Sequence, residues 1–426
     1  MTSGPFVPTL AKPTRIAMAG DDCSLHFDLE DLTPKQQADH LSNQVLTAML
    51  QVALNYMGKP EDQICLYDTF NAAPWQESLS RYRDMFETMG LNIVNLDNVS
   101  FHPFDAYYES VAQSTAAQNS LYMVSHSNKE IHQDHSLLAM SQDLNSKIHF
   151  AEHAPDFGIP TPQTIVTSKG ELDNQIISQP TMLKTLGLAG ARNVTVVSSN
   201  EEASEYLAEY DDDMAVILQE RINLDAYTEM TVDLEVTDKH VEITNVRRIM
   251  FADGLWVGNL LGPDVVLSDT QVEELLKVGR YAQTHGYQHP DGFNLGIDFF
   301  VKDAGAGPDI LVTEINARWT GGLFPAELIR QLNIGDRQVV AFIDMCPPDR
   351  FSEYVTFQER YLHTRSQGDF SIAPMGFAPY PTPLDGKDYL FVWQIVIDDF
   401  EAFKKVKEEE LGPEVLISAP AISVEL

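Results

Sequence analysis

Cysteine and long apolar runs are scarce in this chain, and both deficits narrow the classes of protein to consider. The 426 residues include three cysteines, Cys23, Cys65 and Cys346, which lie far apart without a Cys-x-x-Cys spacing. This spacing argues against a zinc ribbon and a disulfide framework, and it fits a reducing compartment. No run approaches the roughly 18 apolar residues of a membrane-spanning helix, and the first residues do not have the pattern of a secretion signal. We therefore expect a soluble, cytoplasmic protein.

Positive charge is also in short supply. The sequence has 28 Lys and Arg against 63 Asp and Glu, which gives a formal net charge of −35. Nucleic acids and anionic membrane surfaces both attract basic proteins, so we expect neither as a partner. The few basic residues become informative, because a site for an anionic ligand must concentrate them locally.

Hydrophobic patterning in the first 140 residues predicts a small parallel sheet. Segments 14–20 and 63–68 are predicted strands, 41–56 has the spacing of an amphipathic helix, and 91–96 is a third predicted strand. No Gly-x-Gly-x-x-Gly follows the first strand, so dinucleotide binding is not expected. Near the other end, a Gly- and Pro-rich stretch at 366–383 precedes a predicted buried strand at 389–397.

The most informative stretch is the segment 311–322, in which an apolar strand carries Glu314, Asn316 and Arg318 at alternate positions. Side chains alternate across a strand, so these three share one face. A carboxylate, an amide oxygen and a guanidinium together suit a cation and anionic oxygens, which a metal-bound polyphosphate presents. The alternative is an exposed strand with an ion pair between Glu314 and Arg318.

A second strand is predicted at 296–301, and the Gly-rich segment 303–309 after it predicts a hairpin. The hairpin would place Asp298 beside Glu314 and Asn316, whose hard oxygen atoms suit Mg2+. This arrangement resembles the metal-binding end of the ATP-grasp superfamily. The resemblance implies that these three residues hold Mg2+ on ATP, with Mn2+ as the alternative ion. It also implies that Arg318 contacts phosphate or an acyl intermediate.

Two upstream lysines lie at positions similar to those of the nucleotide-binding lysines of this superfamily. Lys147 precedes a predicted helix and the sequence Gly-Ile-Pro-Thr-Pro at 158–162, and Lys184 ends a short apolar strand. The small residues that follow, including Gly187 and Gly190, resemble the loop that folds over the phosphates, where backbone amides approach closely. A solvated surface charge is the alternative for either lysine taken alone.

Between this loop and the hairpin, a predicted strand at 215–222 turns polar and a second begins near Glu229. The segment resembles the linker that holds adenine in the superfamily. By this resemblance Glu220 and the backbone of Ile222 contact the adenine edge, and Glu229 contacts the ribose hydroxyls. Gln219 offers a similar oxygen, and ordinary polarity at a strand end is the alternative for each residue.

Strand alternation over 241–249 points Arg247 and Arg248 to opposite faces, so only one of them can face the site. In similar enzymes a basic residue near this point faces the acceptor carboxylate or the transferred phosphoryl group. The sequence does not choose between the two arginines, and a surface salt bridge is the alternative for either.

Two further polar clusters carry no recognised motif. One comprises His126, His132, Asp134 and His135. Its spacing matches no metal site, so we expect a polar helix or loop. The other follows the first strand and comprises Asp21, Asp22 and His26. Ligands gather at the carboxyl ends of parallel strands, but turn formation explains the two acidic residues equally well.

The resemblance implies a mixed fold of the α/β and α+β classes. A parallel-sheet pre-ATP-grasp domain would precede an ATP-grasp core, which holds the nucleotide between two α+β subdomains. We expect four parts: a pre-ATP-grasp domain at 1–140, a small lid subdomain at 141–225, a large subdomain with the metal site at 226–345 and a C-terminal extension at 346–426.

The implied function is an ATP-dependent carboxylate–amine ligase that forms an amide or peptide bond through an acylphosphate and releases ADP and phosphate. Its partners would be a small carboxylate and an amine, with amino acids or peptides expected. The oligomeric state stays open, with a homodimer as one option. The Trp-Thr-Gly-Gly sequence after Arg318 departs from that of biotin-dependent carboxylases and is closer to the Arg-x-Gly-Gly pattern of peptide ligases. A small-molecule kinase and a nonenzymatic ATP-binding regulator are the alternatives.

Overall fold

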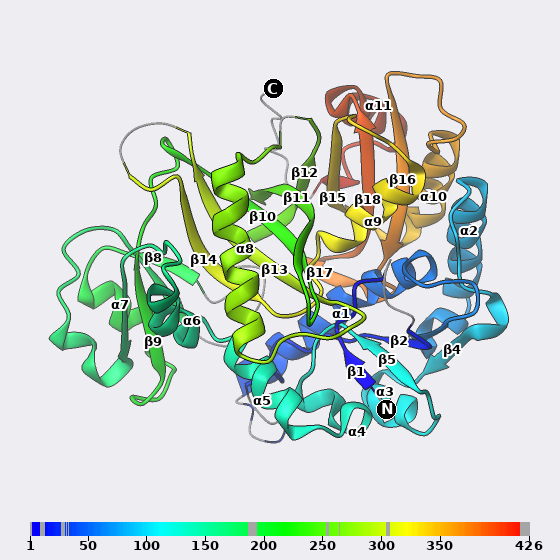
Figure 1. Cartoon of the computed structure of the whole chain (residues 1–426). Coiled ribbons are helices and arrows are strands. Elements are labelled where there is room, and N and C mark those ends of the chain that lie inside the picture. The colour runs from blue at the N-terminus through cyan, green and yellow to red at the C-terminus, as the bar shows by residue number, and fades with distance from the viewer. Residues whose placement is uncertain are drawn as a thin grey trace.

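The computed structural model describes residues 2–8, 13–26, 30, 32, 34–185, 194–252, 255–263, 265–303 and 307–417. Within these residues the strands form three main sheets, and helices pack against them (Figure 1). In this view the N-terminal sheet lies at the bottom, the small sheet at the left, and the large sheet runs from the centre to the upper right. No helix in this part of the chain is both long enough and apolar enough to cross a bilayer.

The N-terminal sheet is parallel. Its order is β1 (Thr2–Gly4), β5 (Gln118–Leu121), β2 (Arg15–Ala17), β3 (Gln63–Tyr67) and β4 (Val99–His102). Helix α1 (Pro34–Met57) connects β2 to β3, and α2 (Trp75–Thr88) follows β3. The predicted α/β opening, with strands near 14–20 and 63–68 and a helix over 41–56, is confirmed.

The predicted strand at 91–96 is wrong. Residues 91–95 are irregular, and the next strand is β4. Val94 is buried, but its backbone amide donates to the carbonyl of Asn55 in α1, at 2.9 Å. Its own carbonyl accepts from the guanidinium of Arg83 in α2, at 2.8 Å. The segment satisfies these backbone groups against helices, so it needs no neighbouring strand.

A small antiparallel sheet follows. Its order is β6 (Thr164–Ser168), β9 (Ala215–Glu220), β7 (Thr181–Thr185) and β8 (Val194–Val197). Its own core includes Leu183 and Leu218 from the strands and Ala203 from α7 (Asn200–Tyr206). Residues 186–193, which contain the predicted phosphate loop with Gly187 and Gly190, lie outside the described residues.

The large sheet is antiparallel. Its main path runs through β14 (Ile310–Asn316), β13 (Phe293–Lys302), β10 (Tyr227–Val236), β11 (Val241–Ala252), β12 (Leu255–Leu261), β15 (Val339–Cys346), β18 (Lys387–Asp398) and β16 (Phe370–Phe377). Off this path, β17 (Thr382–Leu384) pairs with β18, and β19 (Leu416–Ile417) pairs with β15. The accompanying helices are α8 (Asp269–Thr284), α9 (Leu323–Leu332), α10 (Phe351–Arg360) and α11 (Phe400–Leu411). The hairpin of β13 and β14 and the buried strand at 389–397 are thus confirmed.

The C-terminal strands continue the sheet that carries the hairpin. The predicted boundary at 345/346 falls at the end of β15, which pairs with β12 on one side and β18 on the other. The four-part division of the chain stays a prediction.

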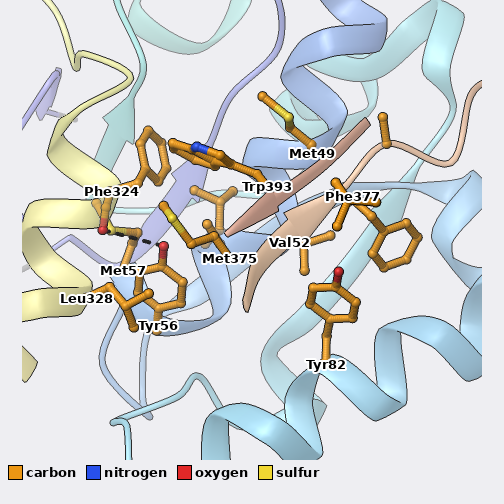
Figure 2. Close-up of a cluster of buried hydrophobic side chains, with 14 of the residues drawn as sticks. Met49, Val52, Tyr56, Met57, Tyr82, Phe324, Leu328, Met375, Phe377 and Trp393 are labelled. Carbon is orange, nitrogen blue, oxygen red and sulfur yellow. Dashed lines mark hydrogen bonds between the residues drawn. The ribbon is translucent and has the colours of Figure 1, made fainter. Parts of the chain in front are cut away.

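Strand β16 lies within the Gly- and Pro-rich stretch, and its glycine has a packing role. A Cβ on Gly376 would lie 2.0 Å from the carbonyl oxygen of Met49, so glycine allows β16 to approach α1 closely. Met375 and Phe377 on either side pack among side chains of α1, α2, α9 and β18 (Figure 2). The two ends of the chain therefore share one hydrophobic core.

Candidate active site

The polar face of the β13–β14 hairpin is built by strand register. Asp298 pairs with Glu314 across the hairpin, and Gly296 pairs with Asn316. Thr231 of β10 is the partner of Asp298 on its other side. The amide of Asn316 donates to the carboxylate of Asp298 at 3.0 Å. The alternation predicted from the sequence therefore brings two carboxylates and one amide to the same face.

Lys147 meets this face from the first residue of α6 (Lys147–His153). Ser146 caps that helix by accepting from the backbone amide of His149, at 3.2 Å, which fixes where α6 begins. The Nζ atom of Lys147 then lies 2.8 Å from Oε1 of Glu314. Residues more than 160 positions apart are joined here.

Lys184 lines a pocket together with Lys147, from β7 of the small sheet. It is buried, and within the described residues no carboxylate forms an ion pair with it. Burial lowers the pKa of Lys184 to about 8, although the nearby carboxylate of Glu314 opposes this change. In the same strand, Thr185 has a buried hydroxyl without a hydrogen-bond partner among the described residues. A buried, unpaired ammonium is costly unless an anion joins it.

The carboxylates respond to the same surroundings in different ways. Burial and the neighbouring charge of Glu314 raise the pKa of Asp298. Burial alone would also raise the pKa of Glu314, but Lys147 and Lys184 outweigh it and lower that pKa overall. Burial and Asp298 raise the pKa of Glu229 to about 7. The charge of Arg318 also lowers the pKa values of Asp298 and Glu314, so three carboxylates and three cationic groups act on one another in this site.

The small pocket of Lys147 and Lys184 lies between the small and large sheets, and its enclosed volume is about 10 Å3. It is lined by Lys147, Phe150, Ala151, Thr161, Thr164, Lys184, Ile217, Gln219, Val312 and Thr313. Its walls combine apolar side chains, hydroxyls and the two ammonium groups. Such a lining offers contacts to both apolar and anionic parts of a ligand.

The residues predicted to contact adenine and ribose lie in two different settings. Gln219 lines the pocket, and its amide donates to the hydroxyl of Thr164 at 3.0 Å. Glu220 is exposed, with its backbone amide bound to the carbonyl of Gln163 at 2.8 Å. Ile222 is half-buried just after β9. Glu229 lies close enough to Lys184 and Asp298 for the charges to influence one another.

Arg247 and Arg248 do lie on opposite faces of β11. Arg248 is exposed, whereas Arg247 is fully buried and forms an ion pair with Asp233. The guanidinium of Arg247 also donates to the hydroxyl of Thr320 at 3.2 Å. A Cβ on Gly322 would fall 1.9 Å from Nε of Arg247, so the Gly-Gly sequence makes room for this side chain. Through Thr231, the partner of both Arg247 and Asp298, Arg247 is the arginine on the face that carries Asp298 and Glu314.

Arg318 links the hairpin to the N-terminal sheet. Its guanidinium donates to Oδ1 of Asn316 at 2.7 Å and to the hydroxyl of Tyr122 at 3.0 Å, and its Nε lies 3.6 Å from Asp22. Burial alone would lower the pKa of Arg318, but Tyr122 and the surrounding carboxylates raise it overall. Sequence reasoning missed Tyr122. The signal was its position directly after β5, at the carboxyl edge of a parallel sheet.

The residues of the two polar clusters without a recognised motif make hydrogen bonds to neighbouring parts of the chain. Asp134 caps helix α5 (His135–Leu144), and His132 bonds to the backbone carbonyl of Ser125 at 3.1 Å. Asp21 is fully buried and accepts from the hydroxyl of Tyr108 at 2.6 Å, and burial raises its pKa to about 8. Burial and the charge of Lys147 lower the pKa of His26 to about 4.

The arrangement of the three sheets, with a pocket between the small and the large one, is the ATP-grasp fold with an N-terminal domain. Among similar solved structures is the N5-carboxyaminoimidazole synthetase from Staphylococcus aureus, with a TM-score of 0.53 and 10% identity over 96% of this chain and 99% of that one. The carboxyaminoimidazole ribonucleotide synthase from Aspergillus clavatus complexed with ATP has a TM-score of 0.52 and 13% identity, over 94% and 97% of the two chains.

A third similar structure is the phosphoribosylamine–glycine ligase from Thermotoga maritima, with a TM-score of 0.52 and 15% identity over 87% of this chain and 95% of that one. No protein-family model matches the sequence, and no curated protein matches it. At these identities the likeness concerns the fold. The chemistry of this chain has to be argued from its own residues.

Proposed function

We propose that this protein is an ATP-dependent ligase that joins a carboxylate to an amine through an acylphosphate, with release of ADP and phosphate. The observation that carries the proposal is the convergence of Lys147 and Lys184 on the face that holds Asp298, Glu314 and Asn316. These residues come from separate elements of the small and large sheets. A fold that needed only an ion pair would not require all of them.

The donor set fits a metal-bound nucleotide. Lys184 is a buried ammonium that lacks an ion-pair partner within the described residues, as a phosphate-binding group would before its ligand arrives. Asp298, Glu314 and Asn316 would hold Mg2+, with Mn2+ as the alternative, and the ion supplies charge neutralisation on the polyphosphate. The Asn316 oxygen accepts from Arg318 and keeps a second lone pair.

We assign the nucleotide to the pocket between the sheets. Lys147 and Lys184 would bind phosphate oxygens, and the apolar walls would take the base. Gln219, Glu220 and the backbone of Ile222 are proposed to contact adenine, and Glu229 the ribose. The loop with Gly187 and Gly190 is proposed to cover the phosphates and to exclude water.

In the reaction, the substrate carboxylate attacks the γ-phosphate, ADP leaves, and the amine displaces phosphate from the acylphosphate. Arg318 would stabilise the oxyanion of the tetrahedral intermediate, since its guanidinium is held in place by Asn316 and Tyr122. Arg247 would act from the same face of the sheet. Amino acids or peptides are the proposed substrates, and the cytoplasm the proposed compartment.

The test is Mg2+-dependent release of ADP and phosphate from ATP across a library of amino acids, dipeptides, other carboxylic acids and amines. Release that needs both a carboxylate and an amine supports the ligase. ADP formed with a single hydroxyl substrate would indicate a kinase, and ATP binding without turnover would indicate a regulator.

Two variants control this assay. Glu314→Ala should abolish the release, because it removes a proposed metal ligand that also pairs with Lys147. The matched control is Glu273→Ala, since Glu273 is an exposed residue of α8. Equal activity in the two variants would contradict the proposed site.

A further inference from the structure

A second group of potential metal ligands lies at the end of the β10–β11 hairpin, outside the nucleotide pocket. Glu235, His240 and Glu242 each offer one ligand atom, and these atoms all lie within 4.8 Å of one another. Glu235 is four residues along β10 from Thr231, the partner of Asp298. At the rise of a strand, the group is about 13 Å from the level of Asp298. It is therefore separate from the proposed nucleotide site.

Strand register places two like charges opposite one another here. Glu235 of β10 pairs directly with Glu242 of β11. Carboxylates in directly opposed positions repel each other, and a sheet normally avoids them. A cation between the two strands would turn this repulsion into attraction.

Glu235 is the buried member of the group. Its side chain is only 7% exposed, and its one charged contact in the described part of the chain is Nε2 of His240, at 3.6 Å. No hydrogen bond to the Glu235 carboxylate is found among the described residues. A Cβ on Gly292 would lie 2.7 Å from Cγ of Glu235, so the covering turn holds this side chain in position. A carboxylate that is nine-tenths buried and aimed at other ligand atoms needs a positive partner.

The ring of His240 is oriented for metal binding by Thr237. The Thr237 hydroxyl lies 3.0 Å from Nδ1 of the ring, and its oxygen also accepts from the backbone amides of Lys239 and His240, at 3.1 and 2.9 Å. These contacts hold Nδ1 on the Thr237 side and leave Nε2, the other ring nitrogen, facing Glu235 at 3.6 Å. Gln283 of α8 holds the turn by donating to the carbonyl of Thr237 at 2.7 Å. Fixing the far nitrogen in this way is typical of metal-binding histidines.

We infer that Glu235, His240 and Glu242 form a site for a divalent transition-metal ion, with Zn2+ as the suitable probe. One imidazole and two carboxylates with an open fourth position are a donor set that Zn2+ accepts. An imidazole ligand also disfavours Mg2+ and Ca2+, which prefer oxygen. Zinc bonds of about 2.1 Å require the ligand atoms to close in on each other. His240 and Glu242 can do so because both are exposed and free to rotate.

The test is Zn2+ binding to the metal-stripped full chain in the presence of excess Mg2+, measured by competition with a chromogenic chelator. We expect one Zn2+ per chain at this site. His240→Ala should weaken it more than about 100-fold, because loss of an outer partner alone costs about 10–100-fold. Thr237→Val should cost about 10–100-fold, since it removes only the hydroxyl that orients the ring.

Two variants serve as controls. Glu314→Gln changes the proposed nucleotide site and should leave Zn2+ binding at the hairpin intact. His135→Ala removes another exposed histidine and should also have no effect. Co2+ bound in place of Zn2+ should give a visible absorption band that His240→Ala removes.

Zn2+ binding that is unchanged in His240→Ala, or no binding by the wild-type chain, would overturn the inference. The second result would mean that a proton on His240 is the only partner of Glu235. Both outcomes are independent of ATP turnover, so they do not bear on the ligase proposal.

Discussion

Two lysine–carboxylate pairs of almost equal length are placed in very different surroundings. In the C-terminal half, Nζ of Lys407 lies 2.9 Å from Asp344, and the two side chains are 4% and 0% exposed. In the pocket, Nζ of Lys147 lies 2.8 Å from Glu314, with 14% and 21% exposure. By the distance between nitrogen and oxygen alone, the two ion pairs would be regarded as equivalent.

The two ion pairs differ in the groups that surround them. The second oxygen of Asp344 accepts from the hydroxyl of Tyr354 and from the amide of Gln394, at 3.1 Å for the amide. Both oxygens of Asp344 therefore have partners inside the protein, and we refer to this group as the closed network. The pair of Lys147 and Glu314 lies at a pocket beside Lys184, whose ammonium has no ion-pair partner among the described residues. The comparison teaches that a saturated buried pair supports the fold, whereas an unsaturated one at a pocket is available to a ligand.

The largest effect should come from breaking the closed network. Lys407→Met leaves the carboxylate of Asp344 buried without its counter-charge, so we expect the free energy of unfolding to fall by about 3–5 kcal/mol. Urea unfolding followed by circular dichroism measures this. A loss below about 1 kcal/mol would mean that the closed network does not support the fold.

A lysine-to-methionine substitution at the pocket should instead lower activity without lowering stability. Lys184→Met should lower ADP release by about 10²–10³-fold, or about 2.7–4 kcal/mol, because a charge aimed at the phosphates is lost. The free energy of unfolding should stay the same or rise, since the substitution removes a buried ammonium that has no ion pair within the described part of the chain. Steady-state kinetics and urea unfolding of the same sample check both. If Lys184→Met were as destabilised as Lys407→Met, the two lysines would not differ in the way proposed.

The burial of Lys184 also predicts that nucleotide binding depends on pH. The pKa of Lys184 is lowered from 10.5 to about 8, so above pH 8 the folded protein loses this charge. Affinity for a nonhydrolysable ATP analogue should then fall by up to about tenfold per pH unit above pH 8. Between pH 8 and 10.5 the unfolded chain still binds the proton, so this group alone makes stability rise with pH there.

Calorimetric titrations from pH 7 to 9.5 test this dependence, with Lys184→Arg as the control. Arginine keeps its charge throughout this range, so the variant should lack the fall in affinity. Identical pH profiles for the two proteins would show that another group governs binding.

The smallest effect is expected at the exposed member of the arginine pair. Arg248→Ala should change the free energy of unfolding by less than about 0.5 kcal/mol and activity by less than about twofold, because the side chain is in solvent. Arg247→Ala leaves Asp233 buried without its partner and should be strongly destabilising. Thermal unfolding of both variants, together with ADP release, compares them. Equal effects would contradict the assignment of Arg247 to the inner face.

The parts of the site that depend on local sequence pattern could be predicted from the sequence. Strand alternation was sufficient to place Asp298, Glu314 and Asn316 on one face, since hairpin partners are close in the chain. For Lys147 and Lys184 the prediction rests on family resemblance, because no local rule marks a lysine that meets a strand far away in sequence.

Contacts between distant elements were the part that pattern could not supply. The bond between Arg318 and Tyr122 depends on how the N-terminal sheet packs against the large sheet. The segment at 91–96 was mistaken for a strand because its apolar residues do face the core, while its backbone bonds go to helices instead. Burial periodicity carries no information about where backbone hydrogen bonds go.

The close approach of Gly376 to Met49 has a consequence for biosynthesis. The apolar side of α1 is covered by a strand that leaves the ribosome more than 300 residues later, which at 5–20 residues per second is a delay on the order of tens of seconds. During that interval the nascent chain carries an uncovered helix face, a natural binding surface for chaperones. The N-terminal segment should thus become protease-resistant only after translation has passed β16 and β18.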